Sequence, residues 1–317
     1  MVRPPTDAAQ AGWPPPPYLP PPPPVAVPGP VISPEPGSPL TGARRYDGVT
    51  YATSPGYRPR LLDLWVPETA SGAGPGRAVP LVVWIHGGGW LDGDRRYPPP
   101  TVPAELLFGS ILNRGMAVAT VDYRHSLEAP FPAQLHDVKA AIRYLHRFRA
   151  ELGIDTRRIG LWGESAGGHL AALAGLTAGS GDHEGTEGVR GESGTIAAVV
   201  DWYGVSDLRP LLSRPLPPGL EDLPDPFTSL LGGADPASAD AASPVTYAGP
   251  SAPPFLLVHG TGDRVVPFSQ SERLAALLDD AELVPVEGAD HVFMGSSDIA
   301  GIVAGGAAFL ARHLKAG

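Results

Sequence analysis

Two glycine-rich turns hold residues that could do chemistry, and the first contains a serine. Gly163-Glu164-Ser165-Ala166-Gly167 fits the pattern G-x-S-x-G, which needs a strand-to-helix turn so sharp that the serine hydroxyl is exposed above the sheet. The turn follows an apolar run at 158–162 and precedes small residues that let a helix lie close to a sheet. Alone the motif is weak in a glycine-rich chain, and an ordinary glycine turn is the alternative.

The second turn is His86-Gly87-Gly88-Gly89-Trp90, which also follows an apolar run. Three successive glycines let a loop fold so that several backbone N–H groups point at one spot. An oxyanion hole needs such preorganised donors where negative charge develops. This motif is the more specific of the two, and each strengthens the interpretation of the other.

A serine nucleophile needs a base and a carboxylate to orient it. Of the nine histidines, His291 lies in a loop directly after the last apolar run, and Asp263 lies in the loop after the preceding one. The order Ser165, Asp263, His291 is the one expected for a nucleophile on this type of turn. Asp207 is a rival acid that could instead cap a helix, and Asp290 is adjacent to His291, so their side chains should point apart.

Strands and helices alternate along the chain from about residue 45. The apolar patterns predict an edge strand at 60–66 and core strands at 81–85, 116–121, 158–162, 196–202, 254–259 and 282–287, with helices at 104–114, 135–152, from about 165, at 268–279 and at 303–315. The alternation predicts an α/β fold with a mostly parallel sheet and helices on both faces. Ser165, Asp263 and His291 would then share the carboxyl edge of that sheet.

The composition excludes several classes of protein. With 317 residues, 43% of them hydrophobic, the chain can build one large domain. A net charge of −10 gives no basic surface for nucleic acid or for a membrane. The absence of cysteine excludes a disulfide framework, a zinc–thiolate site and an iron–sulfur cluster. No histidine cluster has metal-ligand spacing, so we predict neither a metal nor a cofactor.

Residues 1–40 differ from the rest of the chain, because they hold 16 of its 40 prolines. We expect them to form a Pro-rich extended or disordered arm. Residues 41–317 are then one catalytic domain with a small cap-like insertion at about 207–251, in which only 227–231 suggests a helix. Neither a secretory signal nor a membrane-spanning run is recognised, so a cytoplasmic location is expected.

In these motifs the sequence resembles the α/β-hydrolase fold esterases. The similarity is to the hormone-sensitive-lipase group and, more closely, to the bacterial acetyl xylan and feruloyl esterase-like branch, over roughly residues 58–312. It rests, in chain order, on His86–Trp90 with Gly93-Asp94, Val121–Arg124, Phe131–Gln134 with Asp137-Val138, Gly163–Leu170, Ser243–Val245, His259–Asp263 with Val266-Pro267, and His291.

The resemblance implies a role for each matching residue. It makes Ser165 the nucleophile, Asp263 and His291 its triad partners, and the backbone N–H groups of Gly88, Gly89 and Ala166 the oxyanion hole. The chain departs from the family in three ways. Glu164 stands where the hormone-sensitive-lipase group usually carries Asp, the proline arm is not part of the pattern, and the large amino-terminal helical cap is missing. The substrate preference of that group is therefore not transferred.

These observations predict a serine esterase that acts on short-chain acyl esters through a covalent acyl-enzyme. The expected partner is a small-molecule ester, and a homodimer is left open. The same triad could cleave amides or peptides, or transfer the acyl group to an alcohol other than water. A binding protein on this fold would be expected to lack part of the triad. Trp90 is predicted to bind substrate, with a place in the core as the alternative, and Glu164 is predicted to anchor the turn around Ser165.

Overall fold

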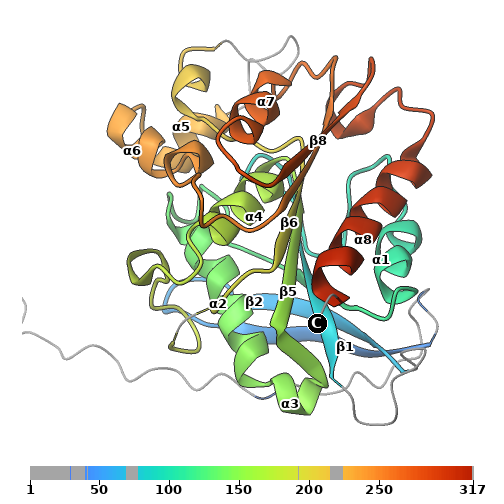
Figure 1. Cartoon of the computed structure of the whole chain (residues 1–317). Helices are drawn as coiled ribbons and strands as arrows, with labels where there is room; N and C mark the ends of the chain where they lie inside the picture. Colours follow the sequence, from blue (N-terminus) through green and yellow to red (C-terminus); the bar gives the residue numbers. More distant parts are fainter. Residues whose placement is uncertain are drawn as a thin grey trace, which may run out of the picture.

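The computed structural model describes residues 29, 40, 42–68, 78–191, 193–214 and 224–315. Apart from Gly29 and Leu40, the predicted Pro-rich arm lies outside the described residues. Within the described part, eight strands form one sheet in the order β1-β2-β4-β3-β5-β6-β7-β8. β2 pairs antiparallel with both β1 and β4, whereas β4, β3, β5, β6, β7 and β8 pair in parallel. Helices cover both faces of the sheet (Figure 1).

The strands are β1 (Ala43–Ala52), β2 (Arg60–Pro67), β3 (Val79–Ile85), β4 (Ala117–Val121), β5 (Ile154–Glu164), β6 (Ala198–Trp202), β7 (Phe255–Gly260) and β8 (Ala281–Val286). The α-helices are α1 (Ala104–Leu112), α2 (Ala133–Arg147), α3 (Arg149–Leu152), α4 (Ala166–Leu176), α5 (Pro226–Leu231), α6 (Pro236–Ala241), α7 (Ser269–Ala275) and α8 (Ile299–Lys315). Short 3-10 turns are η1 (Gly181–His183), η2 (Arg209–Leu211), η3 (Pro244–Thr246) and η4 (His291–Phe293).

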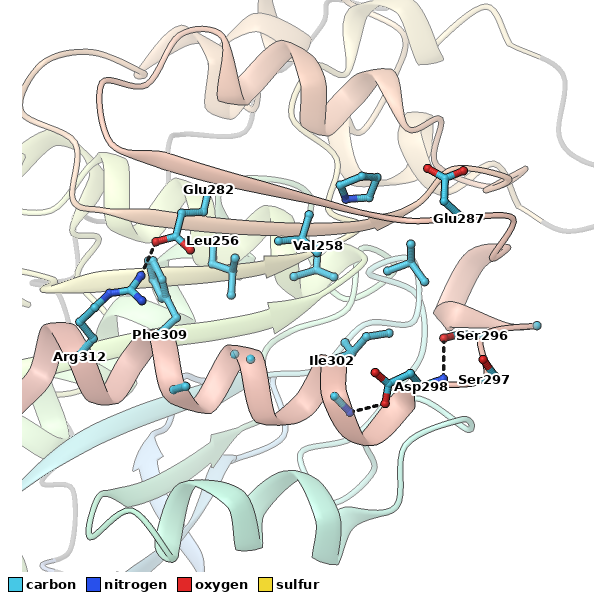
Figure 2. A pocket seen from close by; sticks show the side chains of 18 residues that line it. Leu256, Val258, Glu282, Glu287, Ser296, Ser297, Asp298, Ile302, Phe309 and Arg312 are labelled. Carbon is cyan, nitrogen blue, oxygen red and sulfur yellow. Dashed lines mark hydrogen bonds and ion pairs between the residues drawn. The ribbon is translucent and has the colours of Figure 1, made fainter.

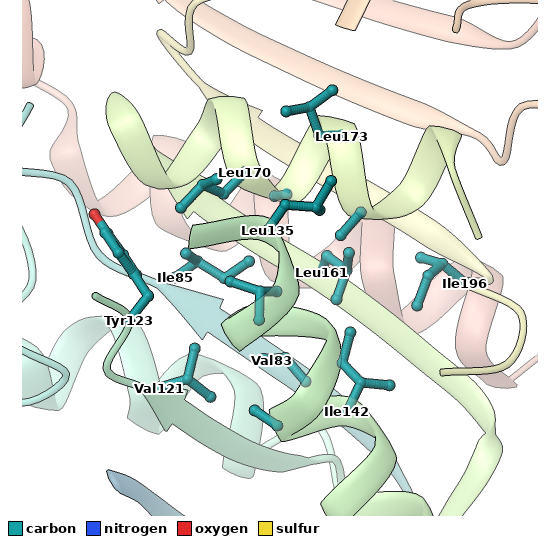
Figure 3. Close-up of a cluster of buried hydrophobic side chains, with 14 of the residues drawn as sticks. Val83, Ile85, Val121, Tyr123, Leu135, Ile142, Leu161, Leu170, Leu173 and Ile196 are labelled. Carbon is teal, nitrogen blue, oxygen red and sulfur yellow. The ribbon is translucent and has the colours of Figure 1, made fainter. Parts of the chain in front are cut away.

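β3 shows why a central strand of this sheet is wholly apolar. Val83 and Ile85 belong to the core on one face of the sheet, whereas Val82 and Trp84 belong to the core on the other. Successive side chains of a strand point to opposite faces, and both faces are covered by helices. The first core lies beneath α2 and α4, where Figure 3 labels Val83, Ile85, Val121, Tyr123, Leu135, Ile142, Leu161, Leu170, Leu173 and Ile196.

The second core contains a cluster of aromatic rings that connects two of the predicted site loops. Trp162 of β5 meets Trp202 of β6 edge to face, with 4.9 Å between ring centroids. Trp202 in turn meets Phe293 of η4 at 5.2 Å. A Cβ at Gly306 of α8 would overlap the Trp162 ring, so a glycine there lets α8 lie against this aromatic cluster. The end of β5, where Ser165 follows, is thereby packed against the loop that holds His291.

Three local features differ from the sequence-based expectations. The single helix predicted at 135–152 divides at Phe148 into α2 and α3, and Gly153 ends it in the left-handed conformation, as its sequence suggests. β5 begins at Ile154, earlier than expected. The insertion contains a second helix, α6, which we did not predict although Asp235 precedes Pro236 there. Asp235 caps α6 through the N–H of Ser238, and the pair Asp-Pro is a recognised helix start.

Candidate active site

Ser165 lies at a sharp turn between β5 and α4, as predicted. Its backbone has φ 53° and ψ −119°, a strained conformation for a residue with a side chain. A Cβ at Gly163 would overlap the carbonyl of Gly167, and a Cβ at Gly167 would overlap the carbonyl oxygens of Ile85 and His86. Only glycine fits at both positions, and the turn therefore holds the serine in this conformation.

Ser165, His291 and Asp263 form one continuous hydrogen-bonded chain. Ser165 Oγ lies 3.0 Å from His291 Nε2, and His291 Nδ1 lies 2.7 Å from Asp263 Oδ2. Asp263 Oδ1 accepts hydrogen bonds of 2.8 Å from the backbone N–H groups of Val265 and Val266. The structure thus brings the three predicted triad residues together from the ends of β5, β7 and β8.

The charge on Asp263 determines the state of His291. Burial raises the pKa of Asp263, but hydrogen bonds from His259 and His291 outweigh it and bring the pKa to about 2. An ionised carboxylate can only accept, so His291 Nδ1 carries the proton and Nε2 offers a lone pair to the Ser165 hydroxyl.

The two rival acids are engaged elsewhere. Asp207 pairs with Arg273 at 2.6 Å and accepts from the backbone N–H of Arg209. Asp290 pairs with the Arg264 side chain and accepts a hydrogen bond from the backbone N–H of His291. Asp263 is therefore the carboxylate placed to orient the His291 ring.

The glycine loop after β3 presents free backbone donors beside the serine. Gly88 has φ 98° and Gly89 has φ 60°, and a Cβ at Gly88 would overlap the carbonyl of Asp92. None of the described residues accepts a hydrogen bond from the N–H groups of Gly88, Gly89 or Ala166. Unpaired backbone donors persist where a ligand or water satisfies them. The three predicted oxyanion donors are thus available for a negatively charged oxygen.

Glu164 connects the two turns, in agreement with its prediction as an anchor. Its side chain is buried, and its Oε1 accepts a hydrogen bond of 2.8 Å from the N–H of Gly87. Burial raises the pKa of Glu164, whereas the His291 charge and the Gly87 N–H partly oppose the rise. A Cβ at Gly87 would overlap the Glu164 carboxylate, so the contact also depends on a glycine in the loop.

Trp90 packs inside the molecule, with 2% of its surface exposed. Its indole Nε1–H donates to His169 Nδ1 at 3.2 Å, and His169 Nε2 donates to the carbonyl of Ala242 at 2.7 Å. Burial lowers the pKa of His169 to about 4, which keeps that ring neutral. Trp90 therefore lies in the core and holds the glycine loop against α4, as in the alternative prediction. A direct contact of Trp90 with substrate stays a prediction.

Two residues near the triad were given no role from the sequence, although His259 begins the His259–Asp263 motif of the resemblance. Tyr203 follows β6 with a positive φ of 44°, and its ring centroid lies 4.9 Å from that of His291. His259, near the end of β7, places Nε2 3.3 Å from Asp263 Oδ2. Both residues lie at the end of a buried apolar run, and therefore at the carboxyl edge of the sheet. That position is the sequence signal that could have marked them as residues of the site.

One cavity among the described residues lies away from Ser165, Asp263 and His291. It has a volume of about 710 Å³ and lies between β8 and α8 (Figure 2). An ion pair between Arg312 and Glu282 spans one end, and Asp298 accepts from the N–H of Gly301 near the other. None of Ser165, Asp263 and His291 lines it.

The described residues include neither a metal-binding cluster nor a membrane-spanning helix. No group of three or more His, Asp or Glu side chains in that part of the chain could hold a metal ion. No helix in the same ranges has both the length and the apolar character needed to cross a membrane.

Comparison with known families and sequences gives consistent matches. The family model BD-FAE matches residues 62–278. Esterase LipQ of Mycobacterium tuberculosis is 34% identical over 253 residues, which cover 78% of this chain and 56% of the relative. Esterase LipC of the same organism is 30% identical over 272 residues, 82% of this chain and 64% of the relative. The chain thus spans between half and two thirds of the length of these curated relatives.

Solved structures match over most of the chain. A truncated carbohydrate esterase from gut microbiota is 29% identical with a TM-score of 0.71, and the match covers 87% of this chain and 99% of that one. Est2, an esterase of Thermogutta terrifontis solved with propionate bound, is 28% identical with a TM-score of 0.65, covering 87% of this chain and 96% of that one. These matches confirm the predicted fold class.

Proposed function

Because the chain belongs to the BD-FAE family of α/β-hydrolase fold esterases, we propose that it hydrolyses carboxylic esters with Ser165 as nucleophile. The observation that carries the proposal is the hydrogen-bonded chain from Ser165 Oγ to His291 Nε2, at 3.0 Å, and from His291 Nδ1 to Asp263 Oδ2, at 2.7 Å. Both distances are within the range that proton transfer and orientation of the base require.

In the acylation step, Ser165 Oγ attacks the ester carbonyl carbon while His291 Nε2 takes the hydroxyl proton. The positive charge that forms on the ring faces the carboxylate of Asp263, which is ionised and buried. The tetrahedral intermediate then expels the alcohol, and His291 returns the proton to the leaving oxygen. The products of this step are the free alcohol and an acyl group bound to Ser165.

The oxyanion of the tetrahedral intermediate would lie among the N–H groups of Gly88, Gly89 and Ala166. Ala166 is the first residue of α4, so the positive end of the helix dipole faces the same spot. Each such donor typically contributes about 3 kcal/mol to the transition state. Glu164 supports this arrangement by fixing Gly87 relative to the turn of Ser165.

In the deacylation step, His291 removes a proton from water, and the resulting nucleophile attacks the acyl-enzyme. The same oxyanion donors stabilise the second tetrahedral intermediate. As its bond to Ser165 Oγ breaks, His291 returns the proton to Oγ, which releases the carboxylic acid and restores Ser165. No metal or cofactor takes part in either step as we propose it.

The acyl group is proposed to be short. α5 of the insertion lies against the glycine loop, since Pro226 would be in van der Waals contact with a Cβ at Gly89, and the Phe227 ring meets that of Trp90. The insertion is thus proposed to act as a small cap that limits the space beside the nucleophile. Est2 of Thermogutta terrifontis has been solved with propionate and with butyrate bound, which supports the same assignment.

Labelling and turnover test this function together. A fluorophosphonate should label the parent at Ser165, and Ser165→Ala should lose both labelling and p-nitrophenyl acetate hydrolysis while keeping its melting temperature, because only a hydroxyl is removed. Labelling that persists in Ser165→Ala would refute the nucleophile. Peptide cleavage or acyl transfer to an alcohol that far exceeds ester hydrolysis would refute the reaction while leaving the triad in place.

A further inference from the structure

His259 is a buried histidine that the proposed mechanism does not use. It lies on β7, is 0% exposed, and has three polar neighbours. Nδ1 lies 2.7 Å from Ser271 Oγ of α7. Nε2 lies 2.9 Å from the carbonyl oxygen of Val266 and 3.3 Å from Asp263 Oδ2. Two imidazole rings, those of His259 and His291, therefore face the same carboxylate oxygen.

These neighbours fix the tautomer of the His259 ring. A carbonyl oxygen only accepts hydrogen bonds, so the atom beside the Val266 carbonyl, Nε2, must carry a proton. Nδ1 is then the acceptor, and the Ser271 hydroxyl donates to it. The Nε2–H is shared between the Val266 carbonyl and Asp263 Oδ2, because both acceptors lie within reach of one proton.

We infer that His259 is a positioning residue for the triad, a role that rests on the proposed esterase function. Its Nε2–H holds the carboxylate oxygen that orients His291, and it shares the charge of that oxygen. The backbone N–H groups of Val265 and Val266 hold the other oxygen, Oδ1. Without His259, His291 would be the only donor to Oδ2 among the residues that the structure describes.

Sharing the carboxylate has a consequence for the base. A carboxylate oxygen with two donors attracts each donated proton less strongly than an oxygen with one. Removing the His259 donor should leave more negative charge facing His291, so His291 should take up a proton at higher pH. The acid limb of kcat/KM, where protonation disables the base, should move in the same direction.

Other charged and titratable groups also face this chain of residues. Glu164 of β5 lies close enough to His291 for a charge on that ring to lower the pKa of Glu164, and Asp201 of β6 is related to His259 in the same way. The Tyr203 ring lies near both histidines, with its centroid 4.9 Å from that of His291 and 6.4 Å from that of His259. Asp290 and Arg264 form an ion pair at the exposed side. All four acidic or phenolic groups remain in the variants below, so a shift of the acid limb reports the loss of His259.

Two substitutions at His259 differ in which ring nitrogen they imitate. His259→Gln places an N–H near the position of Nε2 and can still reach Asp263. His259→Asn places its amide near Nδ1, so it can meet Ser271 but not Asp263. We expect His259→Asn to lower kcat by about tenfold or more, as misplaced groups commonly do, with KM nearly unchanged and the acid limb at higher pH. His259→Gln should restore most of kcat and the parental limb.

The matched control is His146→Asn, which replaces an exposed histidine bound to the hydroxyl of Thr156 at 2.8 Å, on α2. It should leave kcat and the pH profile unchanged. A merely structural His259 would lower the melting temperature of its variants without moving the acid limb. If His259→Asn and His259→Gln both keep the parental limb and rate, the inference is overturned.

A measurement on the parent protein keeps the inference testable if the variants do not fold. Nitrogen-15 NMR of labelled histidine should show His259 protonated at Nε2 and unprotonated at Nδ1 near neutral pH, and the opposite tautomer would refute the shared hydrogen bond. This spectrum needs no turnover. An absence of p-nitrophenyl acetate hydrolysis in the parent would therefore count against the esterase function and not against the hydrogen bond.

Discussion

The carboxylate of Glu164 accepts a 2.8 Å hydrogen bond from the N–H of Gly87. This contact joins the turn that carries Ser165 to the loop that carries Gly88 and Gly89, 77 residues apart in sequence. The proposed oxyanion donors come from both of these segments, so their relative position depends on the contact. A displacement of about 1 Å within an active site can lower a rate by two orders of magnitude.

Substitution of Glu164 should therefore separate its hydrogen bond from its charge. Glu164→Gln keeps an oxygen that can accept from Gly87, whereas Glu164→Ala leaves that buried N–H without a partner. We expect Glu164→Ala to lower kcat by roughly a hundredfold and Glu164→Gln to retain most of it, measured with p-nitrophenyl acetate. Equal losses in both variants would show that the charge matters more than the connection.

The identity of the triad acid gives a second prediction. Asp263→Asn removes the charge that fixes the tautomer of His291, and kcat should fall by about four orders of magnitude. Asp207→Asn is the matched control, because Asp207 pairs with Arg273 away from His291. It should change kcat little. The reverse pattern in steady-state rates would place the acid after β6 and not after β7.

A third prediction concerns stability and Asp201, which is 1% exposed and accepts from the N–H of Gly204 at 2.9 Å. Burial raises its pKa from 3.8 to about 7, although the His259 ring, whenever it is protonated, and the Gly204 N–H oppose the rise. Between these values the unfolded chain has released the proton and the folded chain still holds it. The free energy of unfolding should therefore decrease as pH rises through this window, by about 4 kcal/mol in total.

Asp201→Asn cannot ionise and should not show this decrease. Thermal unfolding of the parent and the variant from about pH 4 to pH 8 checks the prediction. The melting temperature of Asp201→Asn relative to the parent should rise across the window and level off above it. A difference that stays constant over this range would mean that Asp201 does not hold a proton in the folded state.

The position of the proposed triad could be predicted from the sequence because it follows from topology. Parallel strands end at one edge of a sheet, so the loops after β5, β7 and β8, which hold Ser165, Asp263 and His291, had to converge. The turn around Ser165 could be predicted equally well. Gly163 and Gly167 must be glycines, because a Cβ at either position would overlap backbone atoms that are close in the chain or at the end of the neighbouring strand.

Side-chain packing across the sheet could not be predicted in the same way. Trp90 is buried because His169 of α4 and Phe227 of α5 surround it, and no local pattern connects these three positions. Arg60 and Asp137 are likewise fully buried as an ion pair at 3.4 Å, although a charged residue in a sequence favours the surface. Such pairs depend on three-dimensional neighbours, and so does the contact of His259 with Asp263.

The preference for short acyl chains is the last prediction, and the insertion supplies its physical reason. A long acyl chain needs continuous apolar surface beside the nucleophile, but the main apolar residues of the described insertion are turned into the protein. Leu211, Phe227 and Leu230 are all buried in its first core.

Each methylene that finds no apolar surface forfeits about 0.8 kcal/mol of burial, and a methylene that does not fit adds strain. We therefore expect p-nitrophenyl acetate and butyrate to be hydrolysed far faster than the decanoate, measured as kcat/KM. The shared p-nitrophenol leaving group keeps the chemistry of bond cleavage constant, so the profile reports the acyl site alone. A maximum at ten carbons or more would mean that the insertion opens an apolar channel, and the proposed role of α5 beside Gly89 would then be wrong.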